Sequence, residues 1–241
     1  MKILTSVLRS TITAVLLVAV TAGFGLTSHA AFVSIDFGPG AVEPGFDSFP
    51  AGGTNSKTFG GVTVSLSTFG DGLAGNSDRS ETIDQRDRGA PSDNGSFTQG
   101  DLLRDFVFAD HTDRGGGEGL DVTISGLASN AAYGFVLWSN EGATTGVVPQ
   151  FTGDWTANGT PIAALTDHNP GGPAPTSDLN DFRKEFNATS DGSGVIVLRG
   201  VDSGIHRSAH PLNGLQIIPE PTSMVLLALG LAAMIGATRR R

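Results

Sequence analysis

Residues 120–139 read LDVTISGLASNAAYGFVLWS, which is two apolar-rich runs on either side of a turn. In the first run apolar and polar residues alternate, which is the pattern of a strand with one buried face. The second run, residues 133–139, is more continuously apolar and predicts a central strand. Ser129 and Asn130 between the runs are turn residues, so we expect the two strands to form a hairpin.

The same rhythm of short strand and turn continues along residues 31–218. Asn158-Gly159 is the strongest hairpin signal in the chain, and residues 190–193 predict another hairpin. With 34 Gly and 12 Pro the chain is rich in turn residues, which favours short strands over long helices. The predicted strands cover residues 31–37, 58–68, 102–109, 120–127, 133–139, 151–157, 160–165, 181–188, 194–200 and 212–218.

This succession of mostly antiparallel strands predicts an all-β domain, a two-sheet sandwich with a jelly roll as the expected form. The chain contains no cysteine, so an exported domain of this kind must be held by its core, by bound ions or by both. Thiol catalysis and cysteine-based zinc sites are excluded for the same reason. The formal net charge is −9, and such an acidic chain is not expected to bind nucleic acid, because phosphate contacts need clustered Lys and Arg.

Residues 1–30 have the features of a secretory signal peptide. Lys2 and Arg9 give a positive start, an apolar segment follows, and Ser28-His29-Ala30 is a small-x-small cleavage site. The alternative is a first membrane anchor, although the apolar segment is short for that role. We therefore expect the folded domain to occupy residues 31–218 and the tail to begin at residue 219.

The tail, residues 219–241, has three parts. Pro219, Glu220 and Pro221 keep the chain extended, because each proline fixes φ and lacks an N–H group. No residue between positions 222 and 238 is charged, and this run is just long enough to predict a single transmembrane helix. The closing cluster that would stop translocation is Arg239, Arg240 and Arg241.

In that order and at that place, these parts resemble the PEP-CTERM sorting signal of Gram-negative bacteria. The resemblance covers only about a tenth of the chain. It implies recognition by an exosortase, a membrane transpeptidase-like enzyme, with removal of the helix and then release or anchoring at the cell surface. Proteins with this signal are commonly linked to extracellular polysaccharide and the biofilm matrix. The alternative is a plain C-terminal anchor that is never processed.

The body resembles galactose-binding-like domains more loosely. The residues that carry this resemblance are Gly126-Leu127 leading into residues 133–138, together with the last predicted strand, residues 212–217. Because one fold serves many functions, the resemblance implies an architecture and not an activity.

Few residues suggest chemistry. Trp155, beside Asp154 and near a predicted hairpin, is either a core residue or an exposed platform on which a sugar ring could stack. Asp36 on the first strand and Asp202 near the last could meet at an edge of the sandwich and hold a structural Ca²⁺. No other cofactor is expected.

Two further groups of residues, one of carboxylates and one of histidines, could form sites or could have no function. Glu81, Asp84 and Asp87 would share a face on a helical turn and could hold Ca²⁺ or act as paired carboxylates, or they could pair with neighbouring arginines in a solvated loop. His111, His206 and His210 lack the helical spacing of a zinc site and are expected to be exposed loop residues.

Three functions follow, in order of preference. The first is a non-catalytic cell-surface or matrix protein that is exported, passes through the inner membrane and is processed by an exosortase. The second is a carbohydrate-binding module for the extracellular polysaccharide. The third, a glycoside hydrolase or lyase, has no acid pair that the sequence places together.

Overall fold

The computed structural model describes residues 33–51, 55–70, 82–89, 99–110, 119–140, 153–165, 183–202 and 208–220, without the side chains of residues 202 and 208–210. The predicted signal peptide and the predicted apolar helix of the tail lie outside the described residues. No helix within the described part of the chain is long and apolar enough to cross a membrane.

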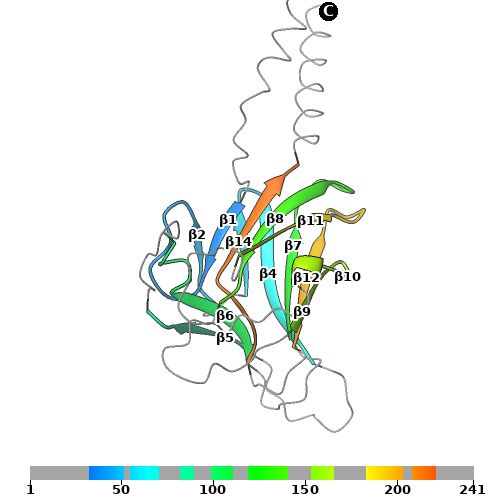
Figure 1. Ribbon diagram of the computed structural model, residues 1–241. Helices are drawn as coiled ribbons and strands as arrows, with labels where there is room; N and C mark the ends of the chain where they lie inside the picture. The colour runs from blue at the N-terminus through cyan, green and yellow to red at the C-terminus, as the bar shows by residue number, and fades with distance from the viewer. Residues whose placement is uncertain are drawn as a thin grey trace, which may run out of the picture. The chain divides into compact units, whose positions relative to one another are not determined.

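The described residues form three sheets, which are mostly antiparallel (Figure 1). The five-stranded sheet has the order β11-β8-β14-β1-β2, and only its β1–β2 pair is parallel. Its strands are β1 (Val33–Phe37), β2 (Asp47–Phe49), β8 (Ala132–Trp138), β11 (Arg183–Thr189) and β14 (Gly214–Pro219).

The six-stranded sheet has the order β10-β9-β12-β7-β4-β3. Its strands are β3 (Ser56–Phe59), β4 (Val62–Phe69), β7 (Gly119–Ser125), β9 (Gly153–Ala157), β10 (Thr160–Pro161) and β12 (Ile196–Asp202). A third sheet, in the order β13-β6-β5, was not expected from the sequence; it contains β5 (Thr82–Asp87), β6 (Asp105–Asp110) and β13 (Ser208–Leu212). A short 3-10 helix, η1 (Ala163–Leu165), follows β10.

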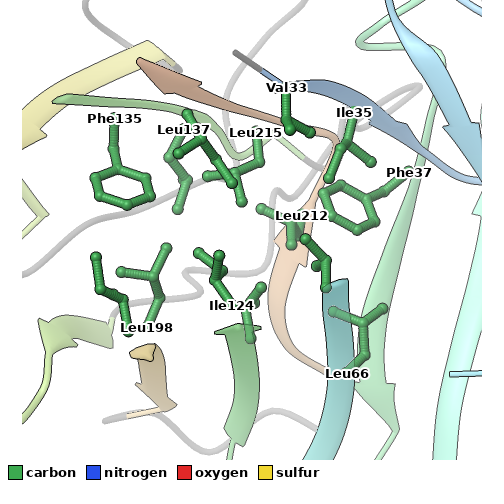
Figure 2. Packing of buried hydrophobic residues seen from close by; sticks show 14 of the residues in the cluster. Val33, Ile35, Phe37, Leu66, Ile124, Phe135, Leu137, Leu198, Leu212 and Leu215 are labelled. Atoms are coloured by element: carbon green, nitrogen blue, oxygen red, sulfur yellow. The ribbon is translucent and has the colours of Figure 1, made fainter. Parts of the chain in front are cut away.

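The two larger sheets share one apolar core, as the sandwich prediction requires. In Figure 2 the side chains of Phe135, Leu137 and Leu215 from the five-stranded sheet face Leu198 and Ile124 from the six-stranded sheet. The alternation seen in the sequence explains this packing, since every second residue of β4 and β7 is buried. The buried members of these two strands are Val62, Val64, Leu66, Leu120, Val122 and Ile124.

The sequence predicted where most strands lie more accurately than it predicted which strands pair with each other. The hairpin at Asn158-Gly159 is confirmed, because Thr160 pairs with Ala157 and Asn158 has a left-handed φ of 49°. The single strand predicted for residues 58–68 is wrong. Gly60 and Gly61 have positive φ values and turn the chain, so β3 and β4 pair with each other as a hairpin.

Both hairpins predicted at Ser129-Asn130 and at residues 190–193 are wrong, because each turn carries the chain from one sheet to the other. β7 pairs with β4 and β12, whereas β8 pairs with β11 and β14. The two turns, which we call the arches, hydrogen-bond to each other instead of closing their own strands. Their mutual backbone bonds are Leu127 N–H to Gly194 O, Asn130 N–H to Asp191 O and Ser190 N–H to Ala131 O.

A small second apolar cluster covers the outer face of the five-stranded sheet. It contains Leu102, Leu103, Val136 and Trp138, with Phe46 packed edge-on against the Trp138 ring at 5.6 Å between centroids. The strand that was predicted to start at residue 102 starts at Asp105. The preceding residues 101–104 form a turn, and this turn covers Trp138. Trp138 is buried, but it lies outside the main core.

Candidate functional site

The folded domain leads directly into the predicted sorting motif. β14 lies between β8 and β1 in the middle of the five-stranded sheet, and Pro219, the first residue of the motif, pairs with Tyr133 of β8. Ile217 is fully buried, and the side chains of Pro219 and Glu220 are half-buried. Pro221 and the terminal arginines, Arg239, Arg240 and Arg241, lie outside the described residues. The motif therefore begins inside the sheet and not in a spacer after it.

Two buried carboxylates lie near the C-terminal end of β1, at the opposite end of the sheet from Pro219. Asp36 is 3% exposed, and its Oδ2 accepts a hydrogen bond from the backbone N–H of Glu43 at 2.7 Å. Asp105 is 1% exposed, and its Oδ2 accepts one from the backbone N–H of Gly40. Burial raises the pKa of Asp36 to about 7 and the pKa of Asp105 to about 6. The mutual repulsion of Asp36, Asp105 and Glu43 adds to the rise at Asp36.

Asn213, between β13 and β14, joins the segments around these acids. Its Nδ2 donates to the carbonyl O of Asp105, and its Oδ1 accepts from the backbone N–H of Asn140, both at 2.7 Å. Its backbone accepts from Phe37 N–H at 2.7 Å and donates to the carbonyl O of Trp138 at 3.0 Å. Asn213 is fully buried, so it organises the ends of β1, β6 and β8 around one point. In the sequence, Asn213 is simply a polar residue within a predicted strand that is mostly apolar, and nothing nearby marks its linking role.

The predicted calcium pair stays a prediction. Asp36 lies on β1 of the five-stranded sheet, whereas Asp202 ends β12 of the six-stranded sheet, paired with Gly153, and its side chain is not described. Among the described residues, no group of three His, Cys, Asp or Glu side chains is arranged to hold a metal ion. Ca²⁺ needs ionised carboxylates, whereas burial favours the protonated form of Asp36. The described residues around Asp36 therefore do not form a calcium site by themselves.

The interpretation of Trp155 as an exposed platform is wrong. Its side chain is 0% exposed and belongs to the main core, because β9 turns that residue towards the opposite sheet. Asp154 precedes it on the exposed face of β9. Neighbouring strand residues point to opposite faces, so Trp155 and Asp154 cannot act on one ligand while the strand holds.

An open groove lies at one edge of the sandwich, between β11 and the β9–β10 turn. It has a volume of about 580 Å³ and is lined in part by Asn158, Ile162, Phe186 and Asn187. The Phe186 ring is half-buried and stacks on Phe135 with 5.2 Å between centroids and an angle of 11°. Phe186 is thus an aromatic residue that lines the groove, and it was not among the predicted site residues because the sugar-stacking pattern considered was that of Trp and Tyr.

Asn158 fixes one wall of this groove. Its Nδ2 donates to the carbonyl O of Thr189 at 2.9 Å, and its Oδ1 accepts from the N–H of Val197 at 2.8 Å. One side chain therefore ties β11 of the five-stranded sheet to β12 of the six-stranded sheet.

The acidic trio does not form a helical face. Asp84 and Asp87 lie on β5, three residues apart, so they project to opposite faces of a strand, and Glu81 lies outside the described residues. Asp87 receives hydrogen bonds from Arg104 Nη2 at 2.7 Å and from Nε at 3.0 Å, which lower its pKa. Pairing of an acid in this group with an arginine was expected, and Asp87 pairs with Arg104. Arg86 lies over the Phe108 ring at 4.5 Å. The side chains of the histidines named above are not described.

A folded sandwich whose last central strand leads into a sorting signal defines an exported protein. The signal is shown by the family model for the PEP-CTERM protein-sorting motif, which matches residues 218–241. This confirms the resemblance drawn from Pro219, Glu220 and the apolar tail. The comparison with curated protein sequences gives no match.

Solved structures of carbohydrate-binding proteins show a distant likeness. A family 35 carbohydrate binding module from Clostridium thermocellum has 13% sequence identity and a TM-score of 0.35, covering 64% of this chain and 92% of its own. The corresponding module from Paenibacillus barcinonensis has 13% identity and a TM-score of 0.30, covering 64% and 99%. The sandwich is assigned here from its strand pairing and shared core, not from these likenesses.

Proposed function

We propose that this protein is an exported cell-surface or extracellular-matrix protein, processed by an exosortase and carrying a non-catalytic β-sandwich of jelly-roll form. The observation that carries the proposal is the sorting motif at residues 218–241, attached to a folded domain through its last strand. The motif addresses the chain to the membrane enzyme, and the domain is the part that reaches the surface. Because the chain has no cysteine, the domain outside the cell would be held by its packed core and not by disulfides.

The surroundings of four described carboxylates favour a structural role for the β-sandwich domain. Asp36 and Asp105 are buried and bonded to backbone N–H groups, while Asp87 and Asp121 are paired with Arg104 and Arg199. A general acid or base must reach a substrate proton, and these four groups are occupied by backbone N–H groups or by arginines, two of them in the interior. We therefore assign the domain a packing, spacing or adhesive role.

The test is the fate of the full chain in a Gram-negative host with an exosortase and in the same host without it. We expect a surface or extracellular form that lacks the tail in the first host, and an inner-membrane form with the tail in the second. Fractionation and the intact mass of the product measure both. A tail retained in both hosts would contradict processing and would favour the plain anchor.

A second candidate function is carbohydrate binding at the edge groove. The ring of Phe186 and the exposed hydroxyl of Thr160 both line the groove, and sugars bind to proteins by stacking on aromatic rings and by hydrogen bonds to their hydroxyl groups. Binding of the producer's own polysaccharide should weaken in Phe186→Ala and Thr160→Ala. Thr68→Ala, which alters a second hollow beside β4, is the matched control. Equal binding by all variants would contradict the groove as the site.

The hydrolase or lyase alternative has a separate test. Turnover of the polysaccharide that is lost in Asp84→Asn or Glu81→Gln would favour an enzyme. Asp84 is half-buried and its Oδ1 accepts from the N–H of Gln85 at 2.8 Å, so Asp84→Asn keeps an acceptor at that position.

A further inference from the structure

The longest strand at an edge of the described sheets is β11. It ends the five-stranded sheet, so one of its sides pairs with β8 and no described strand pairs with the other side. An unpaired strand side is a row of backbone donors and acceptors to which another chain can add a strand. We propose that a second copy of this protein pairs there, β11 against β11 and antiparallel, and joins two five-stranded sheets into one. This inference rests on the packing, spacing or adhesive role proposed above, for which it names the partner.

The residues of β11 that face its free side follow from two hydrogen bonds. Ser190 continues the β11–β8 register, and its N–H donates to the carbonyl O of Ala131 at 2.9 Å, so the even-numbered residues of the strand bond to β8. The carbonyl O of Thr189 points the other way, because it accepts from Asn158 Nδ2, outside β8, at 2.9 Å. The residues whose backbone groups face a partner strand are therefore Glu185, Asn187 and Thr189.

The edge groove runs along this free side. Five consecutive residues of β11, 185–189, line it. Neighbouring side chains of a strand point to opposite faces, so a hollow lined by all five follows the backbone of the strand and not one face of the sheet. The other wall includes residues 160–164, from β10 and η1. An added strand would thus enter an existing groove of about 580 Å³.

The second half of β11 lacks the features that block pairing at the other described edges. Sheet edges are protected by proline, by charges or by being short. Proline lies in β10 and β13, lysine lies in β3, β2 has only three residues, and β5 carries charged residues in both halves. β11 has seven residues, and its second half, Phe186–Thr189, has neither a charge nor a proline. This half is therefore suited to pair with a strand of the same sequence.

One register brings the uncharged halves of two copies together. With Asn187 opposite Asn187 of the second copy, Phe186 lies opposite Ala188, and Glu185 lies opposite Thr189. Each large apolar side chain then meets a small one, and no two like charges face each other. The two Asn187 residues both direct their backbone groups to the free side, so they can exchange N–H···O bonds.

The charges of β11 also permit self-pairing. A chain with a net charge of −9 repels its own copies, so association is least opposed where negative charge is low. β11 carries Arg183 and Lys184 against a single acid, Glu185, whose Oε1 lies 2.6 Å from Arg183 Nη2. In the register above, both basic residues lie outside the paired stretch 185–189, so they do not oppose each other across the pair.

The first test uses cross-linking, because a chain without cysteine reports one contact through one introduced cysteine. Asn187→Cys in the full chain should form a disulfide-linked dimer under an added oxidant, since opposite residues of an antiparallel pair are within disulfide reach. Ser56→Cys, an exposed change on the edge strand β3, is the matched control and should stay monomeric. Non-reducing gels of both variants from the host with the exosortase measure the dimer. A dimer band no stronger for Asn187→Cys than for Ser56→Cys overturns the proposal.

The second test exchanges charges at the same position and identifies the partner as a second copy. Two copies of Asn187→Asp place like charges opposite each other, as do two copies of Asn187→Lys, whereas a mixed pair places opposite charges there. We expect the mixed dimer to form about threefold more than either self-dimer. Co-expression with two different tags and capture through one tag measures it. Asn187 is exposed, so both variants should melt with the natural chain, and equal dimer formation in all combinations overturns self-pairing.

The outcomes separate this inference from the proposed function. A chain that forms the dimer but keeps its tail in both hosts supports self-pairing and contradicts only the processing. A chain that is processed and stays monomeric overturns self-pairing alone. If a polysaccharide occupies the groove instead, the natural chain binds it and Asn187→Cys does not cross-link, which also overturns the inference.

Discussion

Asn213 donates a hydrogen bond from Nδ2 to the carbonyl O of Asp105 at 2.7 Å, across 108 positions of sequence. The same side chain accepts from the N–H of Asn140, so it links three separate segments inside the protein. Both partners are backbone groups, and the amide that joins them is fully buried. This single polar residue thus holds together the end of the sandwich that contains the two buried acids.

Removing that amide should be costly. Asn213→Ala would leave the carbonyl of Asp105 and the N–H of Asn140 without their partner, and we expect a loss of about 3 kcal/mol in the free energy of unfolding. Urea denaturation measures it as a lower midpoint at an unchanged slope. Gln216→Ala is the control, because that half-buried amide makes one bond of 3.2 Å to Ser34. Equal losses in both variants would contradict the central role of Asn213.

The arches should be coupled through Ser190. Its Oγ donates to the carbonyl O of Ala128 at 2.5 Å and accepts from the N–H of Ala131 at 3.0 Å, and the residue is buried. We expect Ser190→Ala to lower the free energy of unfolding by about 2 kcal/mol and to speed amide exchange at Ala131. Ser193→Ala, an exposed change in the same turn, should leave both unchanged. Exchange at Ala131 that stays slow in Ser190→Ala would show that the arches hold without it.

Stability should fall as the pH rises, because of Asp36 and Asp105. Their pKa values in the folded protein are about 7 and about 6, above the ordinary 3.8 that the unfolded chain retains. Between these values the folded state holds protons that the unfolded state has lost, so the stability that these two groups contribute is full below pH 3.8 and declines up to about pH 7. For Asp36 this contribution is on the order of 2–4 kcal/mol.

Asp36→Asn should remove most of that decline, since an amide keeps an acceptor for the N–H of Glu43 and does not ionise. Melting temperatures at about pH 5 and about pH 8 measure the difference, with Asp47→Asn, a change at an exposed position of β2, as the control. The same pair of proteins tests the predicted Ca²⁺ site. An ion bound by Asp36 and Asp202 would need the ionised form, so added Ca²⁺ would stabilise the natural protein above pH 7 and not Asp36→Asn.

Trp155 should affect stability and not ligand binding. Its fully buried ring fills the core, so Trp155→Ala should cost about 4 kcal/mol, while Trp155→Phe should cost much less. Asp154→Ala on the exposed face is the neighbouring control. Polysaccharide binding that is lost in Trp155→Phe at full stability would contradict its assignment to the core.

Local signals in the sequence were sufficient for much of this protein. The alternation in β4 and β7 correctly identified their buried faces, and Asn158-Gly159 correctly identified a hairpin, because these features depend on neighbours a few residues apart. The same holds for the tail, whose motif and apolar run are read along the chain. Even the turns at residues 126–131 and 190–195 were placed correctly.

The local sequence did not determine whether each turn closes a hairpin or connects the two sheets. Ser129-Asn130 can close a hairpin or form an arch, and the choice depends on β12, which pairs with β7, and on the second arch, which satisfies the backbone of the first. The burial of Asp36, the linking role of Asn213 and the burial of Trp155 have the same origin. Each depends on residues tens of positions away, which meet only when the two sheets enclose a common core.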